Sequence, residues 1–405
     1  MKTTVAKKFS TFGILVFLFS IIFILFLLKN FFLSASKFTI DEKINDQFEK
    51  NISTPQNKEK DNIKINKPSE IYVGDQKTAE EDLKNVPIDV VYKYIDLRDK
   101  KLDPKLHKKS SKDTENSEIK YSIRSVLKNI PWVRKIFVVM PNEKIKYFKD
   151  PIEIKDKIVY VKDKDLVGFD GRSSVVFEFN LWRLKDFGCS ENFIYFNDDF
   201  FVGEPLEKSD FFYKKDGRIV PFTLYSHCIT NKPYMYEAIH NKCRFYQLKT
   251  GNSNIQNSNY YFRRVIQGYV LIYKIFDKKD IWLPKYPEQT THNAKPFLLS
   301  DIKEAYDIIE KNYEESDDCL RARSPTKNQI IMQTFTDFYF LNKEKRLIKN
   351  LDNGYFQITT LEEDINLNLD LFCINTGEEV VSKEMADRAI RIMENKFPQK
   401  TIYEN

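Results

Sequence analysis

Residues 193–205 read Phe-Ile-Tyr-Phe-Asn-Asp-Asp-Phe-Phe-Val-Gly-Glu-Pro, and they decide the fold. The apolar run of residues 193–196 predicts a buried strand, which ends at Asn197, Asp198 and Asp199. Two adjacent carboxylates at the tip of such a strand need a neutralising partner, because an unpaired buried charge loses its solvation. A divalent metal that carries a phosphate is one such partner, since hard cations prefer carboxylate and phosphate oxygens. The simpler interpretation is a solvated turn in which Asp198 or Asp199 caps the next element.

The sequence before this stretch alternates between short apolar runs and helical periodicity. Strands are predicted at residues 88–92, 135–140 and 157–161, and helices at residues 118–130 and 175–184. This alternation is typical of an α/β sheet with parallel neighbours, which binds its ligands at the carboxyl ends of the strands. Asp96, Asp99, Asp198 and Asp199 all follow predicted strands. The pattern therefore predicts one site at that edge of the sheet.

The second half of the chain is less regular. Residues 225–290 mix aromatic side chains with Asn and Lys, which predicts loops and short helices over the site. Amphipathic helices are predicted at residues 300–312 and 328–340.

The charge balance gives little guidance about partners. The 405 residues include 65 basic and 59 acidic ones, and the net charge is +6. Because the two signs are interspersed, no nucleic-acid-binding patch is predicted. The length suffices for one large catalytic domain or two smaller ones.

The N-terminus predicts a membrane anchor. Lysines precede an uncharged, mostly apolar run at residues 12–28, and a second apolar patch extends it to residue 33. We expect a cytosolic tail at residues 1–11 and a transmembrane signal anchor at residues 12–33. A removed signal peptide, cleaved near residues 34–36, is the alternative. Residues 34–86 are polar and charged, which indicates a flexible stem before a folded domain at residues 87–405.

Five cysteines are widely spaced and contain no CxxC pair, which excludes zinc-ribbon and thioredoxin motifs. An oxidising compartment would allow one or two disulfides, and the sequence leaves their pairing open.

Four motifs in order resemble the conserved regions of the Stealth proteins. They lie near residues 87–100, 117–205, 255–345 and 370–404. The second region is resembled by residues 121–125, residues 131–136 and the stretch from Phe193 to Asp199. The first includes Asp96 and Asp99, the third runs from His292 through Arg323, and the fourth includes residues 372–375 with Phe397-Pro398 and Tyr403-Glu404.

This family includes bacterial capsular-polysaccharide sugar-phosphate transferases and the catalytic subunit of a Golgi N-acetylglucosamine-1-phosphate transferase. The resemblance implies a nucleotide-diphosphosugar-transferase-like (Rossmann-like) sheet with helices on both faces. It also implies transfer of hexose- or N-acetylhexosamine-1-phosphate from a nucleotide-diphosphosugar, UDP-linked, to a glycan hydroxyl, with release of a nucleoside monophosphate. Mg²⁺ or Mn²⁺ would neutralise the phosphate charge. With the anchor, it implies a single-pass type II membrane protein, in the Golgi lumen of a eukaryote or on the outer side of a bacterial inner membrane.

The resemblance also assigns roles to residues. Asp199, His292 and Arg323 match catalytic positions, and Asp198 with Asp199 matches a metal site. His292 can act as a base or as a phosphate ligand. Arg323 suits a bidentate grip on a diphosphate, and Arg321 competes for that role. Residues that match donor-binding positions are Asp96, Asp99, Glu118, Arg124, Ser173, Ser174, Glu178, Arg183 and Asn197.

Several of these donor-binding positions have a purely structural alternative. Arg124 can form a helix-surface salt bridge, and Glu118 can favour the helix dipole. The segment from Ser173 to Arg183 can be a capped helix with an exposed acid and base. Tyr94 and the Leu97-Arg98 step depart from the family pattern, which leaves the nucleotide open. Two other functions remain: a metal-dependent glycosyltransferase and a non-catalytic glycan-binding protein.

Overall fold

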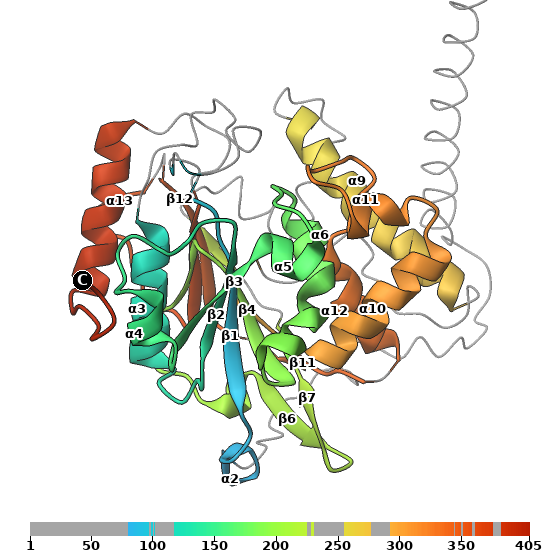
Figure 1. Ribbon diagram of the computed structural model, residues 1–405, viewed down its shortest axis with the longest axis horizontal. Helices are drawn as coiled ribbons and strands as arrows, with labels where there is room; N and C mark the ends of the chain where they lie inside the picture. Colours follow the sequence, from blue (N-terminus) through green and yellow to red (C-terminus); the bar gives the residue numbers. More distant parts are fainter. Residues whose placement is uncertain are drawn as a thin grey trace, which may run out of the picture. The chain divides into compact units, whose positions relative to one another are not determined.

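A five-stranded sheet, in the order β10-β4-β1-β2-β3, is the centre of the computed structural model (Figure 1). Its four parallel strands are β1 (Ile88–Lys93), β2 (Ile136–Met140), β3 (Ile158–Lys162) and β4 (Asn192–Asn197). The edge strand β10 (Lys295–Leu298) is antiparallel to β4. The prediction of an α/β fold with parallel strands is confirmed.

The structure describes residues 80–96, 99, 101, 117–224, 228–230, 255–276, 292–343, 345–349, 351–358, 361–375 and 382–405. The chain divides into two units, residues 1–63 and 64–405, and all described residues belong to the second. The predicted tail and anchor, and nearly all of the predicted stem, lie outside the described residues. No helix within the described ranges is long and apolar enough to cross a bilayer.

Both faces of the sheet are buried, each in its own hydrophobic core. Successive side chains of a strand point to opposite faces, so neighbouring residues belong to different cores. Val91 of β1 belongs to a core formed with α6 (Ser174–Asn180), α10 (Leu299–Asn312) and α12 (Met332–Asn342). Its neighbours Val90 and Tyr92 belong to a second core on the side of α3 (Glu118–Asn129). Helices therefore cover both faces, as predicted.

A second sheet begins directly after the paired acids. Its order is β5-β13-β12-β9, with β5 (Phe200–Val202) antiparallel to β13 (Leu371–Asn375). β12 (Asn353–Gln357) pairs in parallel with β13 and with β9 (Cys228–Thr230). Asp198 and Asp199 thus form the junction between two sheets.

Side chains of α3 form hydrogen bonds with the backbone of β5 on the side away from β13. Ser122 Oγ donates to the carbonyl of Phe200. Ser125 Oγ accepts from the amide of Val202 at 3.0 Å, and Asn129 Nδ2 donates to the Val202 carbonyl at 2.7 Å. The helix therefore satisfies backbone groups that an edge strand would otherwise leave unpaired, and it fixes the strand that follows Asp199.

The C-terminal segment is fastened to the same helix. Arg124 is only 3% exposed, and its guanidinium donates to both carboxylate oxygens of Glu404 at 2.8 Å. It also donates to the carbonyl of Phe397, which follows α13 (Lys383–Lys396), at 2.7 Å. We call Arg124 and Glu404 the C-terminal clamp.

The remaining elements surround these sheets and the helices that cover them. They are α2 (Glu80–Leu83), α4 (Pro151–Ile154), α5 (Asp163–Val167), the 3₁₀ helices η3 (Leu181–Phe187) and η4 (Lys208–Asp210), β6 (Phe212–Lys215), β7 (Arg218–Pro221), β8 (Thr223–Leu224), α9 (Ile255–Ile275), α11 (Ser316–Leu320) and β11 (Ile348–Lys349).

Three of these observations differ from the predictions. The helix α9 replaces the short helices expected in residues 225–290, and Val265, Tyr269 and Ile272 form its buried face at helical spacing. Residues 175–184 turn into the 3₁₀ helix η3 after α6. The helix α2 extends the fold back to Glu80, earlier than the predicted boundary at Pro87, because Lys208 Nζ donates to the Leu83 carbonyl at 3.0 Å.

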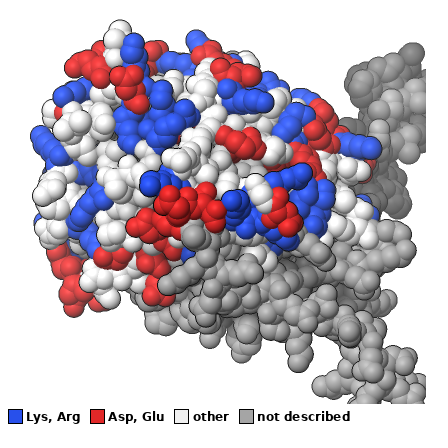
Figure 2. Space-filling view, turned by 90° about the horizontal axis from the view of Figure 1, so that it is seen from below, with Lys and Arg blue, Asp and Glu red and all other residues white. Residues whose placement is uncertain are grey.

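The face shown in Figure 2 carries basic and acidic side chains intermingled, without a large area of one sign. This distribution agrees with the interspersed charges of the sequence.

Candidate active site

The paired acids lie where the order of the parallel strands reverses. β1 connects through α3 to β2 on one side, whereas β4 lies on the other side of β1. The last residue of β1, Lys93, is paired in register with the last residue of β4, Asn197. Ligands of open α/β sheets bind in the crevice outside such a reversal point.

Asp199 is 7% exposed, and its two carboxylate oxygens differ in their contacts. Oδ2 accepts hydrogen bonds from Asn375 Nδ2 at 2.6 Å and from the Cys373 thiol at 3.3 Å. Oδ1 is buried and has no hydrogen-bond partner among the described residues. A buried carboxylate oxygen without a partner is costly, and it indicates a ligand.

Three segments that are far apart in the sequence meet at Asp199. The ligand-type side-chain atoms of Asp199, His292 and Cys373 all lie within 4.8 Å of one another. The His292 ring makes edge contacts with Phe200, at 5.2 Å between centroids, and with Tyr355, at 5.4 Å. The structure thus joins the predicted Asp199 and His292 and adds Cys373 of β13.

Burial and mutual repulsion govern the charges of the pair. Burial raises the pKa of Asp199 above its ordinary value. Burial, together with the charge of Asp199, raises the pKa of Asp198 to about 7. The charge of Lys93 opposes this rise only in part, and two like charges favour protonation; a divalent cation would favour the ionised form of both.

Lys93, the last residue of β1, lies close enough to Asp198 for the two charges to interact. Its ammonium group lies 2.9 Å from the Asp163 carboxylate of α5 and 4.2 Å from the centre of the Phe177 ring. Burial lowers the pKa of Lys93, and the charge of Asp163 opposes this effect. Burial raises the pKa of Asp163 to about 6.

Asp96 and Asp99 lie after β1, as predicted, and they surround Asn142 from the end of β2. The Asn142 side chain accepts from the Asp96 amide at 2.9 Å and donates to Asp99 Oδ2 at 3.1 Å. These contacts hold the loop after β1 against the neighbouring strand.

Asn197 and Glu178 are linked by a tyrosine. The Tyr195 hydroxyl lies 3.0 Å from Asn197 Oδ1 and 3.1 Å from Glu178 Oε1. Glu178 is 5% exposed, and burial raises its pKa. Tyr195 therefore links Glu178 of α6 to Asn197, the last residue of β4.

Ser173 and Arg323 lie in neighbouring loops. Ser173 is buried, and its hydroxyl accepts from Gln329 Nε2 at 2.6 Å, while Ser174 is exposed. The Arg323 carbonyl accepts a hydrogen bond from the Arg172 amide at 2.8 Å. The exposed guanidinium of Arg323 packs 5.2 Å from the centre of the Phe169 ring.

Four other predicted or competing residues lie elsewhere. Arg124 forms the C-terminal clamp, and Glu118 begins α3. Arg183 packs on the Trp182 ring at 5.0 Å. Arg321 forms surface ion pairs with Glu310 and Asp317, so its donors are engaged away from the crevice.

The sequence left the roles of Lys93, Cys373 and Asn375 unassigned. Cys373 and Asn375 lie at alternate positions of one strand, which places both side chains on one face of β13. This alternation, in the fourth region that resembles the Stealth proteins, was the sequence signal that could have placed both residues at the site. Cys189, Cys319 and Cys373 are buried and form no disulfide among the described residues, and the pairing of Cys228 and Cys243 lies outside the described side chains.

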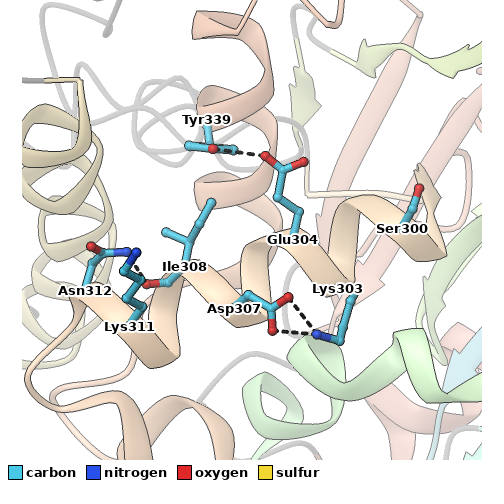
Figure 3. Close-up of a pocket in the computed structure, with 8 residues that line it drawn as sticks. All are labelled: Ser300, Lys303, Glu304, Asp307, Ile308, Lys311, Asn312 and Tyr339. Atoms are coloured by element: carbon cyan, nitrogen blue, oxygen red, sulfur yellow. Dashed lines mark hydrogen bonds and ion pairs between the residues drawn. The ribbon is translucent and has the colours of Figure 1, made fainter.

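A shallow pocket on α10, shown in Figure 3, is a less favourable site. Lys303 pairs with Asp307 at 2.6 Å, and Glu304 accepts from the Tyr339 hydroxyl at 3.1 Å. These polar groups satisfy one another, in contrast to Asp199.

Comparison with known proteins supports the same region. Residues 112–220 match the model of Stealth protein conserved region 2. A capsular polysaccharide phosphotransferase from Neisseria meningitidis serogroup B is 34% identical over 149 residues, which is 32% of this chain and 39% of that protein. One from Haemophilus influenzae is 37% identical over 143 residues, or 31% and 38%.

Similarity at lower identity extends further along the chain. A capsular polysaccharide phosphotransferase from Streptococcus pneumoniae is 25% identical over 313 residues, which covers 71% of this chain and 85% of that protein. The first two relatives are matched over less than half of their own length. The resemblance to the Stealth family is confirmed.

Proposed function

Because the chain carries the conserved region 2 of the Stealth proteins, we propose that it is a sugar-1-phosphate transferase. It would move hexose- or N-acetylhexosamine-1-phosphate from a nucleotide-diphosphosugar, UDP-linked, to a glycan hydroxyl and release a nucleoside monophosphate. The observation that carries this proposal is the pair of half-buried Asp198 and buried Asp199 at the strand-order reversal, inside the matched region.

The reaction requires an acceptor oxygen to attack the phosphorus next to the sugar. The bond from that phosphorus to the nucleotide phosphate oxygen breaks, and the acceptor loses a proton. Positioning and charge neutralisation dominate the catalysis of such transfers. Asp199 is the acid that we assign as essential, and His292 lies beside it as the group that accepts the proton or binds a phosphate oxygen.

The proposed cofactor is a divalent cation, Mg²⁺ or Mn²⁺, with Asp198 and Asp199 as its carboxylate ligands. The donor set fits such an ion, because Asp199 Oδ1 is buried without a hydrogen-bond partner in the described part of the chain and Asp198 lies next to it. When bound, the ion supplies positive charge to the phosphate oxygens of the donor.

The donor would occupy the crevice between β1 and β4. Lys93 supplies positive charge there, and Asp96, Asp99 and Asn197 border it from the strand ends. Arg323, at the loop of residues 168–172, is the proposed diphosphate ligand. The remaining donor-site candidates from the sequence lie on or next to α3, α6 and η3: Glu118, Ser173, Ser174, Glu178, Arg124 and Arg183.

We also propose a type II membrane protein with the domain held outside the cytosol. The support is the apolar run at residues 12–28, which lysines flank on both sides, together with the apolar patch that extends to residue 33. Protease protection of the C-terminal domain in sealed vesicles tests this orientation, and digestion from the cytosolic side alone would contradict it.

The test of function uses the full-length protein with UDP-N-acetylglucosamine, Mg²⁺ or Mn²⁺ and a panel of simple glycans. We expect UMP release and a product heavier by sugar plus phosphate. Asp199→Asn should abolish both, and Asp307→Asn, an exposed acid of α10, is the matched control. Release of UDP with a product heavier by sugar alone would instead establish an ordinary glycosyltransferase.

A further inference from the structure

Three different ligand chemistries converge on one point of the crevice. Asp199 offers a carboxylate oxygen, His292 an imidazole nitrogen and Cys373 a thiol sulfur, all within 4.8 Å of one another. Hard cations such as Mg²⁺ are bound through oxygen, whereas imidazole and thiolate ligands suit zinc and its neighbours. The donor set therefore differs from the one expected for a site made of paired acids alone.

The distances suit a tetrahedral ion. Zinc bonds of about 2.3 Å to sulfur and about 2.0 Å to oxygen place these two ligands roughly 3.5 Å apart. The Cys373 sulfur already lies 3.3 Å from Asp199 Oδ2, so an ion on this sulfur can reach the same carboxylate, whose Oδ1 has no hydrogen-bond partner among the described residues. Only small side-chain movements would bring the three ligands onto one ion.

The surroundings orient the ligands in advance. Asn375 donates to Asp199 Oδ2 at 2.6 Å, and the Ile374 amide donates to the Asp199 carbonyl at 3.0 Å. The His292 ring is held between Phe200 and Tyr355. Groups that fix metal ligands in this way contribute strongly to metal affinity.

A second observation also indicates a ligand at this point. Asp199 Oδ1 is buried and lacks a hydrogen-bond partner among the described residues, although Oδ2 of the same carboxylate has two. A bound ion would satisfy that oxygen.

We propose that Asp199, His292 and Cys373 form a three-ligand site for a borderline divalent cation of the zinc class, with one position left open. On binding, the sulfur, nitrogen and oxygen each donate an electron pair to the ion, and the thiol proton leaves to solvent. Three protein ligands and one open position are the pattern of catalytic rather than structural zinc sites.

This inference deepens the proposed function at Asp199 but does not depend on it, because metal binding is measured without donor or acceptor. It separates two ions. Mg²⁺ or Mn²⁺ would reside with Asp198, Asp199 and the donor phosphates, whereas the zinc-class ion would reside with the sulfur and the imidazole. The Asp199 carboxylate would bridge the two ions, and His292, when it binds the zinc-class ion, would not act as the proton acceptor.

Co²⁺ is the probe, because cobalt bound by a thiolate shows a sulfur-to-metal charge-transfer absorption. The full-length protein, reduced and stripped of metal, should bind one Co²⁺ and show this band. Zn²⁺ should displace the cobalt, and an excess of Mg²⁺ should not. Cys373→Ser should remove the band, while Cys319→Ser, a buried free thiol of α11, should retain it.

Asn375→Ala keeps all three ligands and removes one orienting contact. We expect Co²⁺ affinity to fall about 10- to 100-fold with the band retained. A band that persists in Cys373→Ser would place the ion on another cysteine and overturn the proposal. Absence of any band in the wild type, or unchanged Co²⁺ affinity in His292→Ala, would also overturn it.

The outcomes separate the two proposals. A cobalt band without sugar-phosphate transfer leaves this site intact and rejects the proposed function with that donor. Transfer that is supported by Mg²⁺, in a protein that shows no cobalt band, supports the proposed function and rejects the zinc-class site.

Discussion

Glu404 and Asp199 have the same exposure, 7%, but opposite surroundings. Glu404 receives two hydrogen bonds from Arg124 and one from the Thr401 amide. Burial raises the pKa of Glu404, but these bonds outweigh burial, and the net pKa lies below its ordinary value. Asp199 lies beside a second acid, leaves one oxygen without a partner among the described residues, and has a raised pKa. Burial of a carboxylate therefore does not by itself identify a site. The missing counter-charge does.

The comparison predicts that removal of a charge near Asp199 lowers activity but not stability, whereas removal of a charge from the C-terminal clamp lowers stability. Asp199→Asn should abolish sugar-phosphate transfer, because it removes one carboxylate ligand of the proposed divalent cation. Its free energy of unfolding should not fall in metal-free buffer, because the substitution removes a repulsive charge. Product mass and denaturant unfolding, measured on the same preparation, test both statements. Full activity in Asp199→Asn would break the comparison.

Removal of one partner from the C-terminal clamp should instead reduce stability. Arg124→Met leaves Glu404 buried without its cation, which typically costs about 3–5 kcal/mol in the free energy of unfolding. The double variant Arg124→Met with Glu404→Leu should recover much of this loss, because no charge is then left behind. Equal destabilisation in the single and double variants would show that packing, and not the unpaired charge, determines the effect.

The raised pKa of Asp198 predicts that the free energy of unfolding depends on pH. Its pKa is about 7 in the folded protein and 3.8 in its ordinary state, so the folded state binds more protons between these values. The stability that Asp198 contributes is therefore present below about pH 4 and is lost as the pH rises through about 7. Unfolding in the presence of chelator should show the wild type losing stability relative to Asp198→Asn over this window. A constant difference would exclude the raised pKa.

The smallest effect concerns the backbone that carries Asp199. Ser125→Ala removes the acceptor for the Val202 amide and should cost about 1–3 kcal/mol, the usual penalty of an unsatisfied buried donor. Ser174→Ala is the matched control, because Ser174 is exposed and should change stability by less than about 0.5 kcal/mol. Thermal unfolding of both variants tests the difference. Equal values would show that the contact between α3 and β5 is dispensable.

Local patterns predicted the sheet because its strands and α3 are defined by residues close in sequence. The position of Asp198 and Asp199 at the end of β4 followed from the same patterns. Arg124 resembles an exposed helix residue in sequence, since nothing nearby reveals that Glu404 reaches it. Lys93 was equally unassigned, because its partner Asp163 lies 70 residues away. Burial of such charges depends on distant partners, which periodicity does not report.

The contact between Asp199 and Cys373 joins residues 174 positions apart. The entropy of closing a loop grows with its length, by about 0.6 kcal/mol for each doubling, and contacts of high sequence separation slow folding. The sheet of β1 to β4 can assemble from neighbouring segments, whereas the cluster around Asp199 must wait for β13 to dock. We therefore expect the acids to be the last part of the fold to be enclosed, so that a folding intermediate would hold the scaffold without the site.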